Sequence, residues 1–79
     1  MTLIDSAIAN LEKLMQCYSR DCDQVNFKKA QIELQAYQDV RDGVPRWKGE
    51  MDLHHAEQRG LYARCRVVAE VLAGDKEPV

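Results

Sequence analysis

Apolar residues recur through the first half of the chain at alternating spacings of four and three. The stripe includes one charged residue, Lys29, and no glycine or proline occurs before position 43. This alternation is the heptad pattern of a helix that packs along one seam, and Thr2 followed three residues later by Asp5 is typical of a helix N-terminus. The pattern predicts one long helix over about residues 2–41. Its stripe consists of Ile4, Ile8, Leu11, Met15, Tyr18, Cys22, Val25, Lys29, Ile32 and Ala36.

Three residues that favour helix caps lie close together in a segment that this stripe crosses: Ser19, Asp21 and Asp23. Their side chains compete with the hydrogen bonds of a helix interior and are common at the first position of a new helix. They support an alternative interpretation with a break near residues 19–23 and three helices in all. We prefer the continuous helix because the heptad pattern passes through this segment without a change of phase.

A second stripe with the same rhythm begins at Trp47 and predicts a helix over about residues 46–73. Gly43 is suited to end the first helix and Pro45 to begin the second, which places a turn at 42–46. Gly74 is the expected C-terminal stop. The second stripe consists of Trp47, Met51, His54, Gln58, Leu61, Cys65, Val68 and Leu72.

The two stripes predict an all-α, antiparallel helical hairpin that forms a single domain over residues 1–79, with 74–79 as a frayed C-terminal tail. Facing residues of such a hairpin have position numbers that sum to a nearly constant value. Apolar positions then face apolar ones, and Lys29 lies beside Gln58, so that the polar positions form one layer. The other predicted pairs include Tyr18 with Val68, Cys22 with Cys65, and Val25 with Leu61.

More apolar surface is present than a lone hairpin can bury. The second helix is expected to end too early to cover the start of the first helix, at Ile4, Ile8 and Leu11. The outer side of the first helix carries a further apolar stripe, formed by Phe27, Ala30, Leu34 and Tyr37. The second helix has an outer stripe of mostly small residues, formed by Leu53, Ala56, Gly60, Ala63 and Val67.

These uncovered stripes predict protein interfaces, because several large apolar residues exposed on a small monomer would be a liability. We expect a homodimer resembling a four-helix bundle, with part of the apolar surface reserved for an unidentified protein target. The residues at the hairpin tip, Arg41, Arg46 and Trp47, are candidates for the same kind of contact, since arginine and tryptophan are common interface hot spots.

The outline resembles the plasmid copy-control proteins that dimerise as helical hairpins and the small phage proteins that bind host regulators. This is a likeness of shape and carries no functional residue to this chain. The expected function is that of a small non-catalytic interaction module, a regulator, inhibitor or anti-activator that sequesters another protein. The alternatives are a nucleic-acid-binding transcriptional or copy-number regulator and a structural subunit of a larger assembly.

Charge selects no further partner class. The 13 acidic and 11 basic residues give a formal net charge of -2 and are interspersed along the chain. Arg59, Arg64 and Arg66 form the nearest approach to a basic patch, but neighbouring acids dilute it, so we do not expect nucleic-acid binding. No export signal and no run of some 18 apolar residues is visible, which predicts a cytoplasmic protein without a membrane partner.

The chemically versatile residues do not combine into a recognisable active site. His54 and His55 are adjacent and diverge by about 100° on a helix, which does not suit a shared metal. Three cysteines, Cys17, Cys22 and Cys65, fit reduced thiols better than a disulfide framework. No motif for phosphate, nucleotide or metal binding appears. We therefore expect no enzyme activity, catalytic residue, cofactor, metal or small-molecule substrate.

Overall fold

The computed structural model describes residues 2–44 and 56–75 of the 79-residue chain. These residues form three helices, α1 (Leu3–Arg20), α2 (Gln24–Asp42) and α3 (Ala56–Asp75). The all-α class is therefore confirmed, whereas the continuous helix over residues 2–41 is wrong. The alternative with a break near residues 19–23 is the correct one.

The break between α1 and α2 is formed by cap-forming residues that do not belong to the heptad stripe. Asp21 follows the last residue of α1, and the backbone N–H of Asp23 donates to the carbonyl of Tyr18 at 2.8 Å. Between them Cys22 adopts the left-handed conformation, with φ of 59°. The Asp23 carboxylate then caps α2 by accepting from the backbone N–H of Asn26 at 3.3 Å. The cap hydrogen bonds thus replace those of a continuous helix.

The other described helix ends agree more closely with the sequence. Thr2 caps α1, because its hydroxyl accepts from the backbone N–H of Asp5 at 3.2 Å, which agrees with the helix N-terminus predicted from these two residues. Gly43, with φ of 72°, ends α2 in the left-handed conformation. At the other end of the chain, α3 continues through Gly74 to Asp75, so the predicted stop is slightly early.

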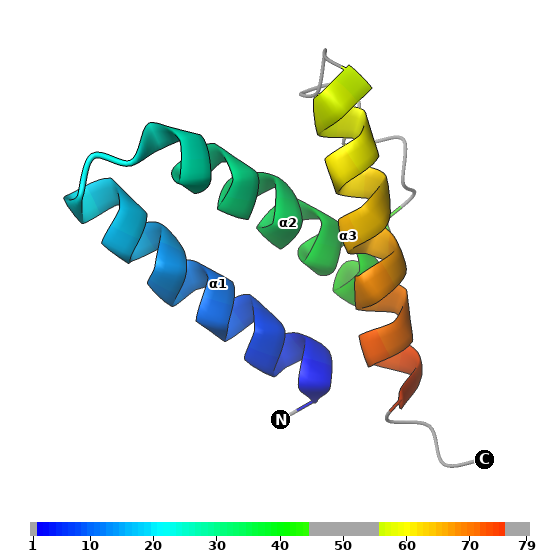
Figure 1. Cartoon of the computed structure of the whole chain (residues 1–79). Helices are drawn as coiled ribbons and strands as arrows, with labels where there is room; N and C mark the ends of the chain where they lie inside the picture. The colour runs from blue at the N-terminus through cyan, green and yellow to red at the C-terminus, as the bar shows by residue number, and fades with distance from the viewer. Residues whose placement is uncertain (1, 45–55, 76–79) are drawn as a thin grey trace.

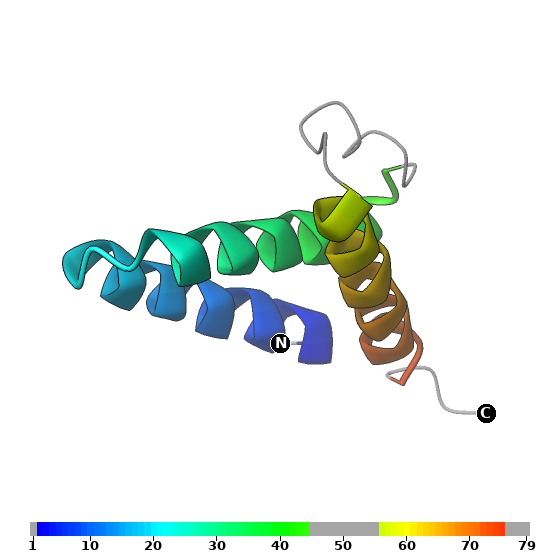
Figure 2. The same ribbon diagram turned by 45° about the horizontal axis from the view of Figure 1, so that its top comes forward.

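Figure 1 shows α1 and α2 as an antiparallel pair, with α3 crossing one end of it. The view in Figure 2 agrees: α3 lies against the start of α1 and the end of α2, and the α1–α2 connection lies far from it. The predicted pairing of one long helix with the second helix is therefore replaced by a three-helix arrangement in which α2 packs against both neighbours.

The core consists of two groups of buried side chains that Tyr37 connects. One lies between α2 and α3, and the other joins the start of α1 to both of the other helices. The first consists of Ile32, Ala36, Tyr62 and Cys65, with Tyr37 and Leu61 packed against it. The second consists of Ile4, Ile8 and Ala69, with Leu34, Tyr37, Val40, Leu72 and Ala73 packed against it.

The reversal of the chain at residues 21–23 corrects two of the surfaces expected to lie uncovered. Ile4, Ile8 and Leu11 are only 2%, 4% and 8% exposed, so the chain buries them itself. The stripe on α2 that was expected to face outward instead faces α1, with Ala30 buried and Leu34 and Tyr37 packed on the core. Each apolar surface covers the other because α1 folds back onto α2.

The predicted pairing of facing residues is not observed where α2 meets α3, because Ile32 packs with Tyr62 and Cys65, and Tyr62 bonds to Asp39. Val25 and Leu61 line one groove between these helices, as do Lys29 and Gln58. The predicted contact of Cys22 with Cys65 is absent, because Cys22 is exposed at the α1–α2 turn while Cys65 is buried between α2 and α3. Tyr18 is displaced from Val68 for the same reason. The predicted partners His54 and Met51 lie outside the described residues.

Candidate protein-interaction surfaces

The side of α3 that faces away from the core is apolar along its whole length. At about 100° per residue, the positions opposite the buried Tyr62, Cys65 and Ala69 fall on one line along the helix. All six are exposed and none is charged, with Val67 at 59% and Val71 at 57% exposure. We call this surface the outer face of α3; it consists of Ala56, Gly60, Ala63, Val67, Val71 and Gly74.

Charged residues flank the outer face on both sides instead of occupying it. By the same helical geometry, Arg59 and Glu70 lie along one edge and Glu57 and Arg64 along the other. A helix on the surface of a monomer normally carries its charged residues directly opposite the core. An apolar centre with charged edges is instead the pattern of a helix that packs against neighbours on two sides.

Gly60 lies in the middle of this face, and no described residue lies where a side chain at this position would project. A Cβ atom built at this position would meet nothing within 4 Å. A glycine in a helix interior costs up to about 1 kcal/mol relative to alanine, and no crowding among the described residues requires it. Close approach of another helix would account for it.

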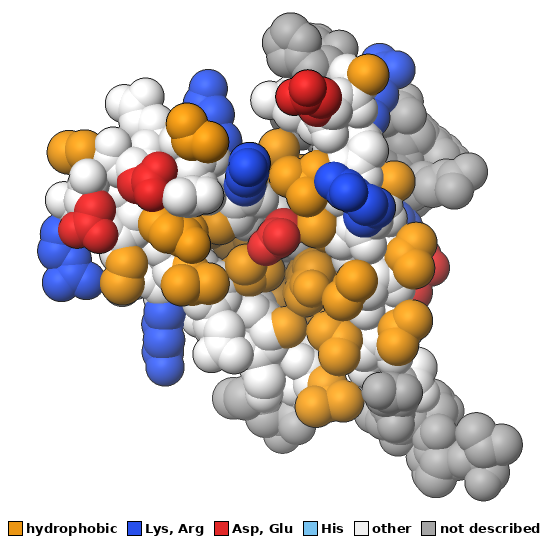
Figure 3. Space-filling view, viewed as in Figure 1, with side chains coloured by type: hydrophobic (Ala, Val, Ile, Leu, Met, Phe, Trp, Pro, Cys, Tyr) orange, Lys and Arg blue, Asp and Glu red, His pale blue; other side chains and the backbone are white. Residues whose placement is uncertain are grey.

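A groove with a volume of about 610 Å³ separates α2 from the first half of α3. Its apolar lining includes Val25, which is 67% exposed, together with Ile32 and Leu61. Lys28 and Lys29 lie on the α2 wall of the groove, and Arg64 lies on the α3 wall. Figure 3 shows hydrophobic side chains and one acidic side chain between positively charged ones where α2 and α3 diverge.

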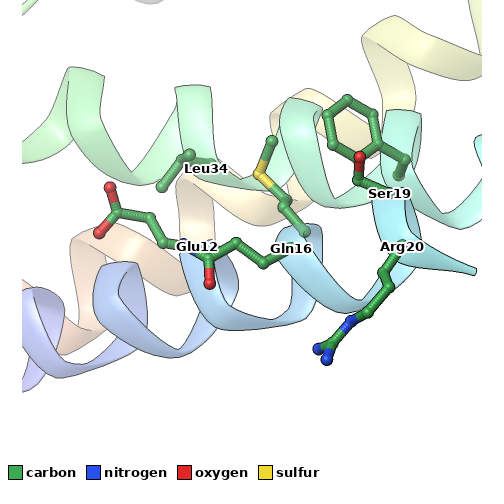
Figure 4. A pocket seen from close by; sticks show the side chains of 7 residues that line it. Glu12, Gln16, Ser19, Arg20 and Leu34 are labelled. Atoms are coloured by element: carbon green, nitrogen blue, oxygen red, sulfur yellow. The ribbon is translucent and has the colours of Figure 1, made fainter.

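A second groove, of about 550 Å³, lies between α1 and α2 and contains two of the predicted interface residues, Phe27 and Leu34. Figure 4 shows Leu34 reaching from α2 toward α1, while Arg20 points away from both helices. The remaining lining is mostly polar and comes from α1. Phe27 and Leu34 are half-buried here, so they contribute first to the α1–α2 contact.

A buried polar cluster fastens the end of α2 to α3. The Tyr62 hydroxyl donates to the Asp39 carboxylate, and the Gln35 amide donates to the same carboxylate at 2.8 Å. Asp39 is 3% exposed, so these bonds replace water around a charge that would otherwise be costly to bury. Burial, then the hydrogen bond to Asp39 and its charge, raise the pKa of Tyr62 to about 12.

The three arginines of the predicted basic patch do not form one surface. Arg66 Nη2 donates to the carbonyl of Val44 at 3.0 Å, and its Nε lies 3.4 Å from Glu70 Oε1. With a side chain only 16% exposed, Arg66 joins α3 to the end of α2. Arg59 and Arg64 are exposed but lie on opposite edges of α3.

The remaining predicted contact residues are only partly described. Leu53, Arg46 and Trp47 lie outside the described residues, so the hairpin tip is represented by Arg41 alone. Arg41 is exposed near the end of α2 and forms ion pairs with Asp42 at 3.2 Å and Asp5 at 3.9 Å. It thereby links the end of α2 to the start of α1.

The thiols differ in environment. All three cysteines are free, with Cys17 and Cys22 exposed and Cys65 buried. Burial, followed by the negative charge of Glu33, raises the pKa of Cys65 to about 11. A protonated, buried thiol is a poor nucleophile, so Cys65 acts as a core residue.

Sequence reasoning missed the exposure of three valines, two of which belong to these surfaces. Val25 and Val68 were assigned to the buried seam, yet they are 67% and 47% exposed. Val71 was not assigned to any stripe. Continuing the spacing of the outer stripe from Val67 by four residues would have found Val71 and shown that the stripe extends along all of α3.

Comparison with known proteins adds no assignment: no family model, curated protein or solved structure matches the chain. Within residues 2–44 and 56–75, no group of three His, Cys, Asp or Glu side chains is placed to hold a metal ion. None of the helices in the same ranges combines the length and the apolar character needed to cross a bilayer.

Proposed function

We propose that this protein is a non-catalytic interaction module: a homodimer that assembles through the outer face of α3 and regulates or inhibits a target protein by binding it. The observation that carries the proposal is the exposed, uncharged line of six residues opposite the core of α3. Stoichiometric binding of this kind needs no catalytic residue.

The outer face of α3 is self-complementary if two copies pack in antiparallel orientation. Its first half has the small residues Gly60 and Ala63, and its second half has Val67 and Val71. Antiparallel packing places Gly60 against Val71 and Ala63 against Val67 of the second copy, so that each large side chain meets a small one. Parallel packing would set glycine against glycine and valine against valine. The two-fold arrangement is also the commonest symmetry of homodimers.

The dimer is expected to be weak. Fully burying a valine contributes about 1.5 kcal/mol or more, and Val67 and Val71 each have just over half of their surface left to bury. A helix of 20 residues is about 30 Å long, which makes a small interface. Dissociation in the micromolar range is therefore expected, corresponding to about 8 kcal/mol.

The test is sedimentation equilibrium from about 5 to 500 μM, a range that brackets this affinity. Val67→Lys with Val71→Lys should leave a monomer of unchanged helix content, since lysine is a better helix former than valine. Leu14→Lys is the matched control, because Leu14 is 45% exposed on α1 and belongs to neither groove nor to the outer face. It should dimerise like the wild type.

Gly60→Ala separates the two consequences of the proposal. It should raise the stability of the monomer by up to about 1 kcal/mol, because the new methyl group meets no atom of the described residues. It should weaken the dimer, because the same methyl group enters the contact with Val71. A wild-type protein that stays monomeric throughout, or a dimer that survives both lysine substitutions, contradicts the proposal.

A further inference from the structure

The groove between α2 and α3 carries a specific combination of an apolar floor and a basic rim. Val25, Ile32 and Leu61 supply the apolar surface, and Gly60 leaves one wall low. Lys28 and Lys29 on α2 and Arg64 on α3 supply positive charge, against the single acidic lining residue Glu57. Among the described lining residues, three cations therefore surround a floor of aliphatic side chains.

None of these three cations forms an ion pair with a described residue. Arg41 and Arg66 each form an ion pair with an acidic neighbour, whereas Lys28, Lys29 and Arg64 form none with any described residue. All three are exposed. A surface that keeps its positive groups unpaired around apolar side chains is complementary to a ligand that is both apolar and acidic.

We propose that this groove binds an amphipathic helix of the target protein that carries Asp or Glu beside its apolar stripe. The inference rests on the proposed function and names the chemistry of the target. Val25 and Ile32 are seven residues apart, as are Glu57 and Arg64, so the lining spans two helical turns, or about 10 Å, on each wall. That length accepts the apolar anchors of a helix at positions i, i+3 or i+4, and i+7.

The lining favours a helix over a nucleic acid. Single-stranded nucleic acids bind on aromatic side chains that stack with the bases, and the described lining of this groove contains none. Its aliphatic floor instead suits leucine, isoleucine or methionine side chains of a partner.

The probe for the test is a display library of random 16-residue peptides, selected against the immobilised full-length protein. Selected peptides should combine apolar residues at helical spacing with Asp or Glu at the flanking positions. A synthetic copy of the best binder, labelled with fluorescein, then gives dissociation constants by anisotropy for the wild type and its variants. Circular dichroism verifies that each variant keeps its helix content.

Reversing the rim charges should weaken binding in a graded manner. Lys29→Glu and Arg64→Glu should each raise the dissociation constant by about 5- to 20-fold, and the triple reversal with Lys28→Glu by about 100-fold or more. Replacing the acids of the peptide with lysine should restore binding to the triple variant. Lys13→Glu, which removes an exposed lysine of α1 outside the groove, is the control and should change binding less than about 2-fold.

Selection of peptides without acidic residues, selection of none, or binding unaffected by the triple reversal would overturn the inference. So would tighter binding of a 16-nucleotide single-stranded DNA than of the selected peptide. Lys28 and Lys29 lie on α2, away from the outer face of α3, so the sedimentation behaviour of Lys28→Glu and Lys29→Glu reports on the proposed dimer separately. A dimer without peptide binding refutes this inference alone, and peptide binding by a monomer refutes the dimer alone.

Discussion

The hydrogen bond between Tyr62 and Asp39 should make a large and pH-dependent contribution to stability. Tyr62→Phe removes the hydroxyl donor and leaves the Asp39 carboxylate, 3% exposed, with the Gln35 amide as its remaining described side-chain donor. Hydrogen bonds to charged groups contribute about 1.5 to 3 kcal/mol, so the variant should lose about that much free energy of unfolding at pH 8. Urea titration followed by circular dichroism measures this difference.

The same difference should shrink in alkaline solution. The pKa of Tyr62 is about 12 in the folded protein and about 10 in the unfolded chain, because burial and Asp39 favour the neutral phenol. The contribution is therefore complete below pH 10 and is lost as the pH rises through 12. At pH 11.5 the ionisation of Tyr62 should have lowered the free energy of unfolding of the wild type by about 2 kcal/mol. The phenylalanine variant has no hydroxyl at this position and does not show this loss.

Two comparisons isolate this effect. Cys65 ionises over a similar range, with a pKa raised to about 11, but it is present in both proteins and cancels in their difference. Tyr18→Phe makes the same chemical change at a half-exposed position and should cost less than about 0.5 kcal/mol at pH 8. The reasoning would be refuted if Tyr62→Phe left the free energy of unfolding unchanged at pH 8. It would also be refuted if the difference in this free energy between the two proteins stayed constant from pH 8 to 11.5.

Two further predictions test the turn that creates the three-helix fold. Cys22→Gly should raise the free energy of unfolding by about 1 kcal/mol, since Cys22 has φ of 59° and glycine adopts this conformation without a steric penalty. A urea midpoint equal to or below that of the wild type would show that the backbone at Cys22 is not strained. Ile8→Ala should cost about 2 to 5 kcal/mol, because Ile8 is 4% exposed beneath α2 and α3. In a long two-helix hairpin Ile8 would lie uncovered, so a thermal melt shifted by less than a degree would favour that fold.

The residues that cap helices predicted the helix ends of this fold better than the heptad pattern did. The caps at Thr2 and Gly43 follow from side-chain and backbone chemistry within a few residues, and both are present. The heptad pattern failed at residues 21–23 because a periodic stripe does not distinguish one helix from two that meet at a reversal. The cap-forming residues Ser19, Asp21 and Asp23 indicated the break, and the chain follows them although the heptad pattern continues through this segment.

The missed reversal also explains which predicted interface residues changed their role. Ile4, Ile8 and Leu11 looked uncovered only because the start of the chain was extended away from the rest. Folding α1 back gives these residues a partner and gives the apolar stripe of α2 one as well. The outer stripe of α3 is unaffected, because its exposure depends on which side of α3 faces the core and not on the path of α1. The described residues of this stripe are therefore still exposed, and they support the proposed dimer.

The two proposed contacts on α3 are adjacent, so they should influence each other. Arg64 lies at the border between the groove and the outer face. In the antiparallel dimer, the Arg64 residues of the two copies come close to the two-fold axis on the same edge, where like charges repel. An acidic helix bound in each groove would neutralise them, and thermodynamic linkage requires that a ligand favouring the dimer is itself bound more tightly by the dimer. Adding the selected peptide should therefore lower the dimer dissociation constant, and Arg64→Gln should lower it without peptide. If the peptide instead dissociates the dimer, the two contacts compete for the same side of α3.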